Sequence, residues 1–323
     1  MMPECVETSQ DVEVSPRPGS LMRRARRHVW RRLHTHQHVE WSIGVFAGDS
    51  PYRLAPACAK RQNPVLTRRD VADTDAFFVA DPFVIRAGAL YYMYFEVMEK
   101  RTKRGSIGLA RSLDGYSWDY VGIVLREPFH LSYPYVFQDE GIHYMLPESH
   151  EKGYVCLYEA ASFPMCWLPR ANLLDGRYVD PSILHTSSGW WLFVGEVGNA
   201  VLRLFHATRL EGPYREHPCS PIVNGDRHRA RPAGRVITWK GRTFRSTQDC
   251  SPHYGLATDV YEITDLSTHG YEERRIDRVL EGSGAGWNSL GMHHMDGMEI
   301  APGRWIAWVD GSRKRWSVTR NRY

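Results

Sequence analysis

The chain has 323 residues, of which 42% are hydrophobic and 24% are charged, and its formal net charge at pH 7 is +4. This length and composition suffice for one large core plus a tail. The sequence contains no run of about 18 apolar residues, the length that a helix needs to cross a membrane. Beyond the N-terminal region, basic and acidic residues are interspersed and no aromatic–basic motif occurs, which argues against a nucleic-acid-binding protein.

The N-terminal region differs from the rest of the chain. Residues 17–38, RPGSLMRRARRHVWRRLHTHQH, are densely basic and lack the apolar core and cleavage site of a signal peptide. Blocks of like charge are commonly solvated, so we expect a disordered basic extension over residues 1–38 and a folded domain over residues 39–323. Trp30 and the arginines leave open a contact with a membrane surface or another polyanion.

A repeat organises the folded part. Its clear copies are VADPFVIRAGALYYMYFE, which ends at Glu96, LSYPYVFQDEGIHYMLPE, which ends at Glu148, and YVDPSILHTSSGWWLFVGE, which ends at Glu196; weaker copies end at Asp249 and Asp310. Each clear copy pairs an apolar strand with a second, aromatic-rich strand across a turn, as in a β-hairpin. The copies recur about every 50 residues, the period of a propeller blade. We therefore predict an all-β fold, a five-bladed β-propeller that forms one cooperative domain.

The six cysteines show neither a C-x-x-C pair nor the spacing of metal ligands. This pattern is typical of proteins in a reducing compartment, so we expect a cytoplasmic protein. Because no second cluster of histidine, cysteine and carboxylate residues has ligand spacing, we expect neither a metal nor another cofactor.

The residues that open the copies are candidates for catalysis. The innermost strand of each propeller blade lines the centre, so Asp81 and Asp180, each followed by proline, could face one another although they are distant in sequence. Cleavage of a glycosidic bond needs one ionised carboxylate and one carboxyl kept protonated as the acid. The alternative is that each aspartate caps a turn at the start of its strand.

Further acids end the second strands of the copies. Antiparallel pairing returns that end towards the opening residue, so Glu96, Glu148, Glu196 and Asp249 could ring the same centre. Glu196 and Glu148 are the first candidates for the catalytic acid. Pairing with nearby arginines is the alternative for each of them.

The opening motifs resemble those of glycoside hydrolase family 43, whose five-bladed propellers begin blades one and three with Asp-Pro and blade two with a small residue before Pro. Over roughly residues 41–311, the chain is similar to the N-terminal domain family of the glucosamine inositolphosphorylceramide transferases, through the segments FFVADPFV, EPFHLSYPYVF, YMLPES, RPAGR and QDCSPHYG. The first resemblance implies that Asp81 is the general base and that Asp180 orients the sugar and tunes the acid.

Blade four departs from family 43, because Ala230 and Arg231 precede Pro232 where those enzymes carry their general-acid Glu. An arginine cannot release a proton near neutral pH, so the usual proton donor is missing. Arg231 suggests instead an anionic group in the substrate, such as a phosphate or a carboxylate, or an ion pair with Asp180 or Asp249.

Other residues are candidates for substrate binding. The segment GMHHMDG offers His294 as a ligand for substrate or water, and several aromatic residues, Trp287 among them, could stack on a sugar ring. The complete set expected to bind substrate is Glu96, His130, Tyr133, Arg231, Gln248, Asp249, Tyr254 and His294.

Two functions fit these residues. One is a glycoside hydrolase or transglycosidase-like enzyme that acts on an anionic or phosphorylated glycoside. The other is a non-catalytic carbohydrate-recognition propeller that assists a glycosyl-transferring or sugar-modifying partner. The missing blade-four Glu favours recognition, whereas the many central acids favour catalysis, since a binding pocket gains little from carboxylates that repel an anionic ligand.

Overall fold

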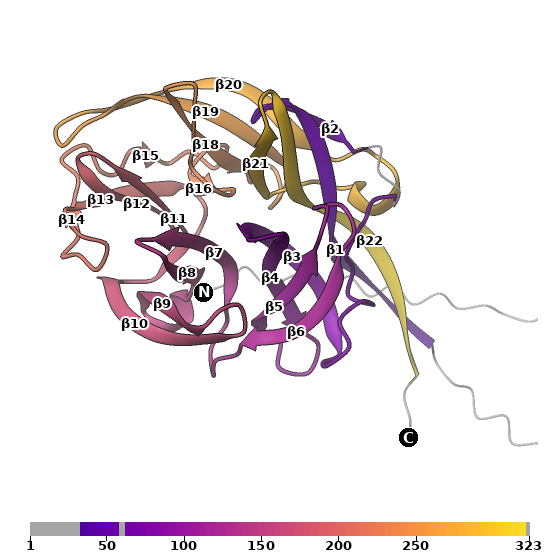
Figure 1. The fold of residues 1–323 in the computed structure, drawn as a ribbon. Helices are drawn as coiled ribbons and strands as arrows, with labels where there is room; N and C mark the ends of the chain where they lie inside the picture. The colour runs from indigo at the N-terminus through magenta and orange to yellow at the C-terminus, as the bar shows by residue number, and fades with distance from the viewer. Residues whose placement is uncertain (1–32, 58–61, 321–323) are drawn as a thin grey trace, which may run out of the picture. The chain divides into compact units, whose positions relative to one another are not determined.

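A computed structural model describes residues 33–57 and 62–320 (Figure 1). The chain separates into two compact units, of which the larger comprises residues 41–313. In the smaller unit, which includes residues 33–40 and 314–320, Arg315 Nε donates a hydrogen bond to Glu40 Oε1 at 3.0 Å. Most of the basic extension predicted over residues 1–38 lies outside the described residues, and strand β1 begins at Leu33. No described helix is long and apolar enough to cross a membrane.

The larger unit contains five antiparallel sheets, which confirms the predicted five-bladed propeller (Figure 1). Blade one is β3 (Ala76–Ala87), β4 (Leu90–Glu99), β5 (Gly105–Ser112) and β6 (Asp119–Leu125). Blade two is β7 (Ser132–Asp139), β8 (Ile142–Glu148), β9 (Tyr154–Ser162) and β10 (Cys166–Asp175). Blade three is β11 (Tyr178–Thr186), β12 (Gly189–Glu196), β13 (Val201–Ala207), β14 (Arg215–Glu216) and β15 (Val223–Asn224). Blade four is β16 (Arg231–Pro232), β17 (Ile237–Trp239), β18 (Arg242–Asp249), β19 (Ala257–Leu266) and β20 (Tyr271–Glu281).

Blade five combines the two ends of the described chain. Its strands run in the order β2 (Arg53–Pro56), β1 (Leu33–Ser50), β22 (Arg304–Arg320) and β21 (Met295–Ala301). The fifth sequence copy supplies only the inner hairpin, β21–β22, and the N-terminal strands supply the outer half. The described part also contains two short 3₁₀ helices, η1 (His150–Lys152) and η2 (Gly286–Asn288).

The blades pack on one another in a closed ring. Strand β3 contacts β7 and β21, while β11 contacts β7 and β16. Gly234 and Met295 form a parallel bridge that joins blades four and five. The second strands lie between neighbouring sheets, so β12 is buried along nearly its whole length. This explains why the second strand of each clear copy is a nearly continuous hydrophobic run rather than an alternating one.

Candidate functional site

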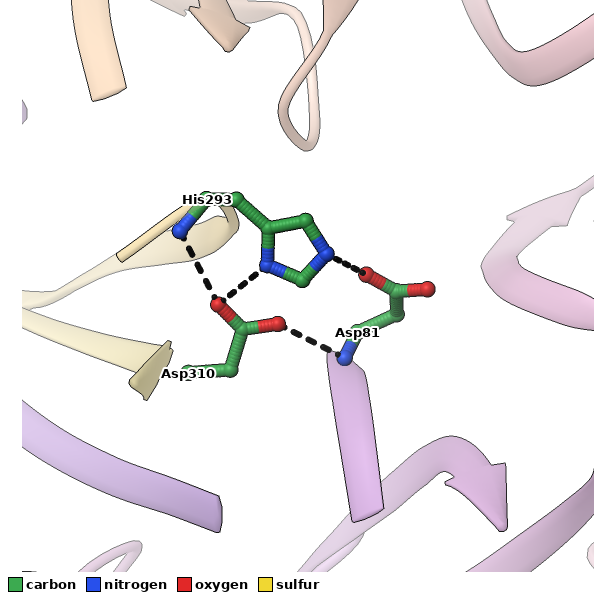
Figure 2. Close-up of side chains that lie close together, drawn as sticks. All are labelled: Asp81, His293 and Asp310. Carbon is green, nitrogen blue, oxygen red and sulfur yellow. Dashed lines mark hydrogen bonds and ion pairs between the residues drawn. The ribbon is translucent and has the colours of Figure 1, made fainter. Parts of the chain in front are cut away.

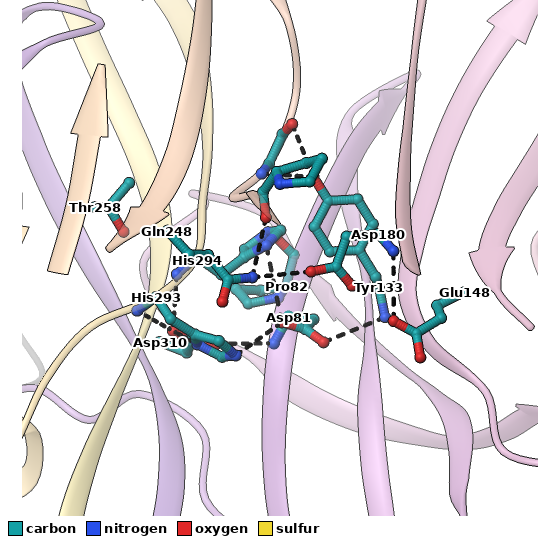
Figure 3. A network of polar contacts seen from close by, with 12 residues as sticks. Asp81, Pro82, Tyr133, Glu148, Asp180, Gln248, Thr258, His293, His294 and Asp310 are labelled. Carbon is teal, nitrogen blue, oxygen red and sulfur yellow. Dashed lines mark hydrogen bonds and ion pairs between the residues drawn. The ribbon is translucent and has the colours of Figure 1, made fainter. Parts of the chain in front are cut away.

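Three blade-opening residues meet at the centre of the propeller (Figure 3). Each has a positive φ, 54° at Asp81, 47° at Tyr133 and 49° at Asp180, and the strand register shifts at the same places. A residue before proline normally adopts an extended conformation, so these positive φ values are unusual. The β-bulges at the same places change the direction in which each side chain points. Such backbone strain persists only where the surrounding structure holds it, and it is commonest at functional sites.

Asp81 lies against a histidine and an aspartate from blade five (Figure 2). His293 Nδ1 donates to Asp310 Oδ1 at 2.7 Å, and His293 Nε2 lies 3.5 Å from Asp81 Oδ1. The backbone N–H of Asp81 donates to Asp310 Oδ2 at 3.1 Å, which ties the first blade to the last. Burial raises the pKa of Asp81 to about 6, although the nearby His293 acts in the opposite direction.

Arg231 is held by an ion-pair network on the other side of the centre. Its Nε and Nη2 donate to the two oxygens of Asp180 at 2.6 and 3.1 Å, and Nη2 also reaches Glu148 Oε2 at 3.3 Å. Nη1 donates to Asn199 Oδ1 at 2.7 Å. The sequence left two roles open for Arg231, binding of an anionic substrate group or an ion pair with Asp180 or Asp249. In the structure, Arg231 forms the ion pair with Asp180. The guanidinium already has its counter-charges without an anionic ligand.

Glu148 is bound on both of its oxygens. Oε1 lies 2.6 Å from His150 Nδ1, and Oε2 faces the Arg231 guanidinium. Burial works against the ionised form, but His150 and Arg231 outweigh it and hold the pKa of Glu148 well below its usual range. This carboxyl is therefore poorly suited to donating a proton, the role expected for it from the sequence.

Glu96 has a different environment. It is 5% exposed and has no hydrogen bond to any residue in the described part of the chain. The His130 ring lies nearby, with its Nε2 3.7 Å from Glu96 Oε1, beyond hydrogen-bond distance. Burial, reinforced first by the Asp81 carboxylate and then by Glu148, raises the pKa of Glu96 well above its usual value. Burial also raises the pKa of Asp180, but the Arg231 guanidinium contacts both of its oxygens and favours the ionised form. Glu96 lacks such a hydrogen-bonded counter-charge among the described residues and is therefore the central carboxyl best suited to remain protonated.

The orientation of His130 follows from its other ring nitrogen. His130 Nδ1 accepts the backbone N–H of Gly105 at 2.9 Å. The neutral ring therefore carries its proton on Nε2, the atom that faces Glu96. Burial lowers the pKa of His130, which favours this neutral form.

Two predicted acids lie in other surroundings. The Glu196 side chain is 36% exposed and pairs with Arg203, and buried Asp249 pairs with His228 and Arg278. No hydrogen bond or ion pair between described residues joins either acid to Asp81 or Asp180. Both acids therefore pair with nearby arginines, which was the alternative expected from the sequence.

Two predicted ligands are parts of the central scaffold. Gln248 Nε2 donates to Asp180 Oδ2 and to the Pro232 carbonyl, both at 2.9 Å. The Tyr133 hydroxyl accepts the Gly234 N–H at 2.6 Å and lies 2.9 Å from the Gly234 carbonyl. Both side chains join blades to one another, and Tyr133 is fully buried.

Of the two aromatic candidates, Tyr254 is exposed and Trp287 is packed against glycines of blade five. Tyr254 is 41% exposed, and its ring centroid lies 5.2 Å from that of buried His293, so it could stack on a bound sugar. Trp287 fills the space above Gly44 and Gly311, where an added Cβ would lie 2.5–2.6 Å from the indole or its neighbour. Trp287 therefore packs the blade-five sheet.

Sequence reasoning did not include Trp41, Asn199 or Asp310 in the site. The Trp41 ring packs against the His293 ring, with centroids 4.0 Å apart and planes tilted by 35°. Asp310 is the last acidic residue of the fifth sequence copy, as Glu96 and Glu148 are of theirs. That shared position was the available signal for Asp310, whereas Trp41 and Asn199 lie outside the motifs.

We expect Glu96→Gln to stabilise the protein at pH 8. A carboxyl whose pKa is raised by folding does not lower the free energy of unfolding at pH values below its pKa in the unfolded chain. It lowers that free energy increasingly as the pH rises towards its pKa in the folded protein. Removing a buried, unpaired carboxylate should therefore raise the free energy of unfolding by roughly 1–3 kcal/mol at pH 8 and much less at pH 4. Urea titrations at the two pH values measure this, with Glu196→Gln as the control; an equal effect at both pH values would contradict the assignment.

The fold is a five-bladed β-propeller, an architecture that several solved glycoside hydrolases share. An exo-1,5-α-L-arabinanase from a bovine ruminal metagenomic library is similar with a TM-score of 0.55 over 77% of this chain and 94% of its own, at 14% identity. At this identity the likeness shows the fold alone. The chain belongs to the family described as "Glucosamine inositolphosphorylceramide transferase 1, N-terminal", whose model matches residues 34–312.

Two plant relatives carry the name glucosamine inositolphosphorylceramide transferase 1. The protein from Oryza sativa subsp. japonica is 35% identical over 297 residues, which cover 84% of this chain and 40% of the relative. The protein from Arabidopsis thaliana is 36% identical over 297 residues, covering 84% and 39%. This chain thus spans about two fifths of the length of these relatives.

Proposed function

We propose that the propeller acts on a glycosidic bond, with Glu96 as the proton donor and Asp81 as the proton acceptor. The observation that carries the proposal is the contrast between Glu96, which is buried and accepts no hydrogen bond from any described residue, and Glu148, which His150 and Arg231 hold ionised. Neighbouring titratable groups whose environments separate their pKa values are typical of acid–base catalysis.

In the proposed reaction, the bond between the anomeric carbon and the leaving oxygen breaks as Glu96 protonates that oxygen. Water, or an acceptor hydroxyl, attacks the anomeric carbon and gives its proton to Asp81. The ionised Glu148 and Asp180 stabilise the positive charge that develops on the sugar. Glu96 thereby replaces the missing blade-four acid, whose place is occupied by Arg231.

The charges suggest how a substrate would lie. The centre gathers five carboxyl groups, those of Asp81, Glu96, Glu148, Asp180 and Asp310, around the guanidinium of Arg231, while a second buried guanidinium, Arg235, pairs with Asp296. This arrangement repels a phosphate, so we propose that the sugar ring occupies the centre while any anionic group of a glycoconjugate stays outside it. The names of the plant relatives make glucosaminides and glycans linked to inositol phosphate the first substrates to test.

A panel of aryl and natural glycosides tests the proposal through release of aryl alcohol or reducing sugar. We expect Asp81→Asn and Glu96→Gln to lower kcat by about 10²–10⁴-fold, while Glu196→Gln, which changes the corresponding strand end of blade three, stays near wild type. The loss in Glu96→Gln should be much smaller for an aryl leaving group of low pKa, because such a group needs no proton. Equal losses for good and poor leaving groups would contradict the role of Glu96 as the acid.

A carbohydrate-recognition propeller is the second candidate function. It is favoured by the replacement of the blade-four acid by Arg231, which neutralises Asp180. Saturable binding of one glycan by wild type, without turnover of any substrate in the panel, would support recognition and refute the catalytic proposal.

A further inference from the structure

His130 lies in the segment before β7, and its neighbours hold both its ring and its backbone. The backbone N–H of Gly105 donates to His130 Nδ1 at 2.9 Å, and the N–H of Leu131 donates to the Gly105 carbonyl at 3.0 Å. The backbone N–H of His130 donates to Glu151 Oε2, also at 2.9 Å. Together these contacts fix the direction in which His130 Nε2 points.

The same contacts determine where the proton of the ring lies. A backbone N–H only donates, so Nδ1 is the acceptor and the neutral ring carries its proton on Nε2. A proton added to Nδ1 would break the contact with Gly105, and burial also lowers the pKa of His130. The charged groups that act on the ring are Glu148, His150, Glu151 and Arg231. His130 thus presents a fixed N–H, with no positive charge, to the centre of the propeller.

This N–H faces the carboxyl group of Glu96. His130 Nε2 lies 3.7 Å from Glu96 Oε1, so a movement of about 1 Å would form a charge-assisted hydrogen bond of about 2.8 Å. Gly105 leaves room for this approach, because a Cβ added there would lie 2.9 Å from Glu96 Oε1 and 3.0 Å from His130 Cε1. One glycine therefore fixes the proton on His130 Nε2 and lets Glu96 lie beside it.

The surroundings of Glu96 oppose its ionisation. Burial is the largest cause, and four carboxylates from other strands repel a negative charge at Glu96. They belong to Asp81 in β3, Glu148 in β8, Asp180 in β11 and Asp310 in β22. An acid that holds its proton too tightly is a poor donor. A cation beside Glu96 would correct this but would ionise it before a substrate arrives, whereas a neutral N–H favours the carboxylate less strongly.

From this geometry we propose that His130 is a positioning residue whose Nε2–H stabilises the carboxylate that Glu96 becomes when it gives up its proton. In the proposed function, on which this inference rests, the Glu96 O–H bond breaks and its proton goes to the leaving oxygen. His130 keeps its own proton throughout, while afterwards Asp81 releases the proton it accepted and Glu96 takes one back from the solvent.

The 3.7 Å separation fits this role. Distances between catalytic groups are often long before a substrate binds and shorten during the reaction. A donor fixed in advance towards the developing charge lowers the barrier, because it acts more strongly on the transition state than on the ground state.

Carbon-13 NMR of the carboxyl groups in the full chain tests the contact without a substrate, with the Glu96 signal assigned by its absence from Glu96→Gln. In His130→Asn, the amide oxygen can accept the Gly105 N–H, but no donor remains at the place of Nε2. We expect this variant to raise the pKa of Glu96 by about 1–2, because a hydrogen bond to a charged group favours it roughly 10- to 100-fold. His130→Gln, which keeps an N–H near that place, should show a smaller rise.

His143→Asn is the matched control. Burial lowers the pKa of His143 as it does that of His130, but His143 lies near the opposite end of β8 from Glu148. The pKa of Glu96 in this variant should equal that in wild type.

A measurement on wild-type protein keeps the test decisive if His130→Asn fails to fold. In nitrogen-15-labelled protein, His130 should be neutral at pH 7 with its proton on Nε2. As the pH rises and Glu96 ionises, this proton should shift downfield, because it enters a hydrogen bond with the new carboxylate.

Activity gives a separate measurement. For any glycoside that wild type hydrolyses, His130→Asn should lower kcat about 10- to 100-fold with KM nearly unchanged. The acid acts while it is protonated, so activity falls as the pH rises through its pKa, and a raised pKa should move this fall to higher pH. A merely misfolded protein would lose activity without moving it.

An unchanged Glu96 pKa in folded His130→Asn protein, a wild-type His130 with its proton on Nδ1, or an Nε2 proton that shows no such shift up to about pH 10 would overturn the proposal. A raised Glu96 pKa without turnover of any glycoside would support the contact between His130 and the Glu96 carboxylate and refute the glycosidic activity alone.

Discussion

Replacing Arg231 with methionine is expected to lower the free energy of unfolding by about 3–5 kcal/mol. The guanidinium is the counter-charge of two buried carboxylates, Asp180 and Glu148, and methionine of similar length would leave both without it. Breaking one partner of a buried ion pair costs far more than the pair contributes, because the remaining charge stays desolvated. Guanidinium chloride titration followed by circular dichroism measures the change.

Arg203→Met is the matched control for this substitution. Arg203 also pairs with two carboxylates, Glu196 and Glu216, but all three side chains are about one-third exposed. Solvent screens such pairs, so the control should lose no more than about 1 kcal/mol. Equal losses in the two variants would show that Arg231 does not have the buried structural role assigned to it.

Deleting residues 1–57, which removes β1 and β2, should abolish cooperative unfolding. These strands form the outer half of blade five, and Ile43 and Val45 of β1 are completely buried in a cluster with Ile306 and Trp308 of β22. Without them, β22 presents an unpaired edge and an exposed apolar face, both of which promote aggregation. Differential scanning calorimetry would register the loss of the single transition.

Deleting only residues 1–32 provides the comparison, since it keeps every described strand. This shorter deletion should retain a cooperative transition near the wild-type Tm. A protein lacking residues 1–57 that still melted cooperatively at the wild-type temperature would show that blade five is stable without its N-terminal strands.

The repeat in the sequence predicted the five blades because each copy carries its own strand, turn and strand. It also indicated the convergence of Asp81 and Asp180, since propeller symmetry brings equivalent positions of different blades to one centre. The ends of the copies did not distinguish Glu96 from Glu196, because strand register decides where each side chain points. Glu96 pairs with Ala80, the residue before Asp81, whereas Glu196 pairs with Tyr178, two residues before Asp180. A shift of one residue turns a strand side chain to the other face of the sheet, so Glu196 pairs with Arg203 while Glu96 is buried near Asp81.

The local sequence pattern also could not predict which segment forms the outer strands of blade five. Residues 41–57 contain no copy of the repeat, and their place depends on pairing with a strand at the opposite end of the chain. Asn199 is similar, because its contact with Arg231 joins two loops or strand ends of different blades. Contacts between residues so far apart leave no periodic signal in a single sequence.

The composition of blade five also bears on when the centre becomes complete during synthesis. Trp41 lies in β1, the first described strand, and Asp310 lies in β22, the last described strand, and both contact His293. A nascent chain can form blades one to four while Asp310 is still in the ribosome. The ends must then find one another over nearly the full length of the chain, a slow non-local step. The chain therefore gains a complete central cluster only in the step that closes the ring, so a protein released before that step carries the central acids without His293 and Asp310 in place beside Asp81.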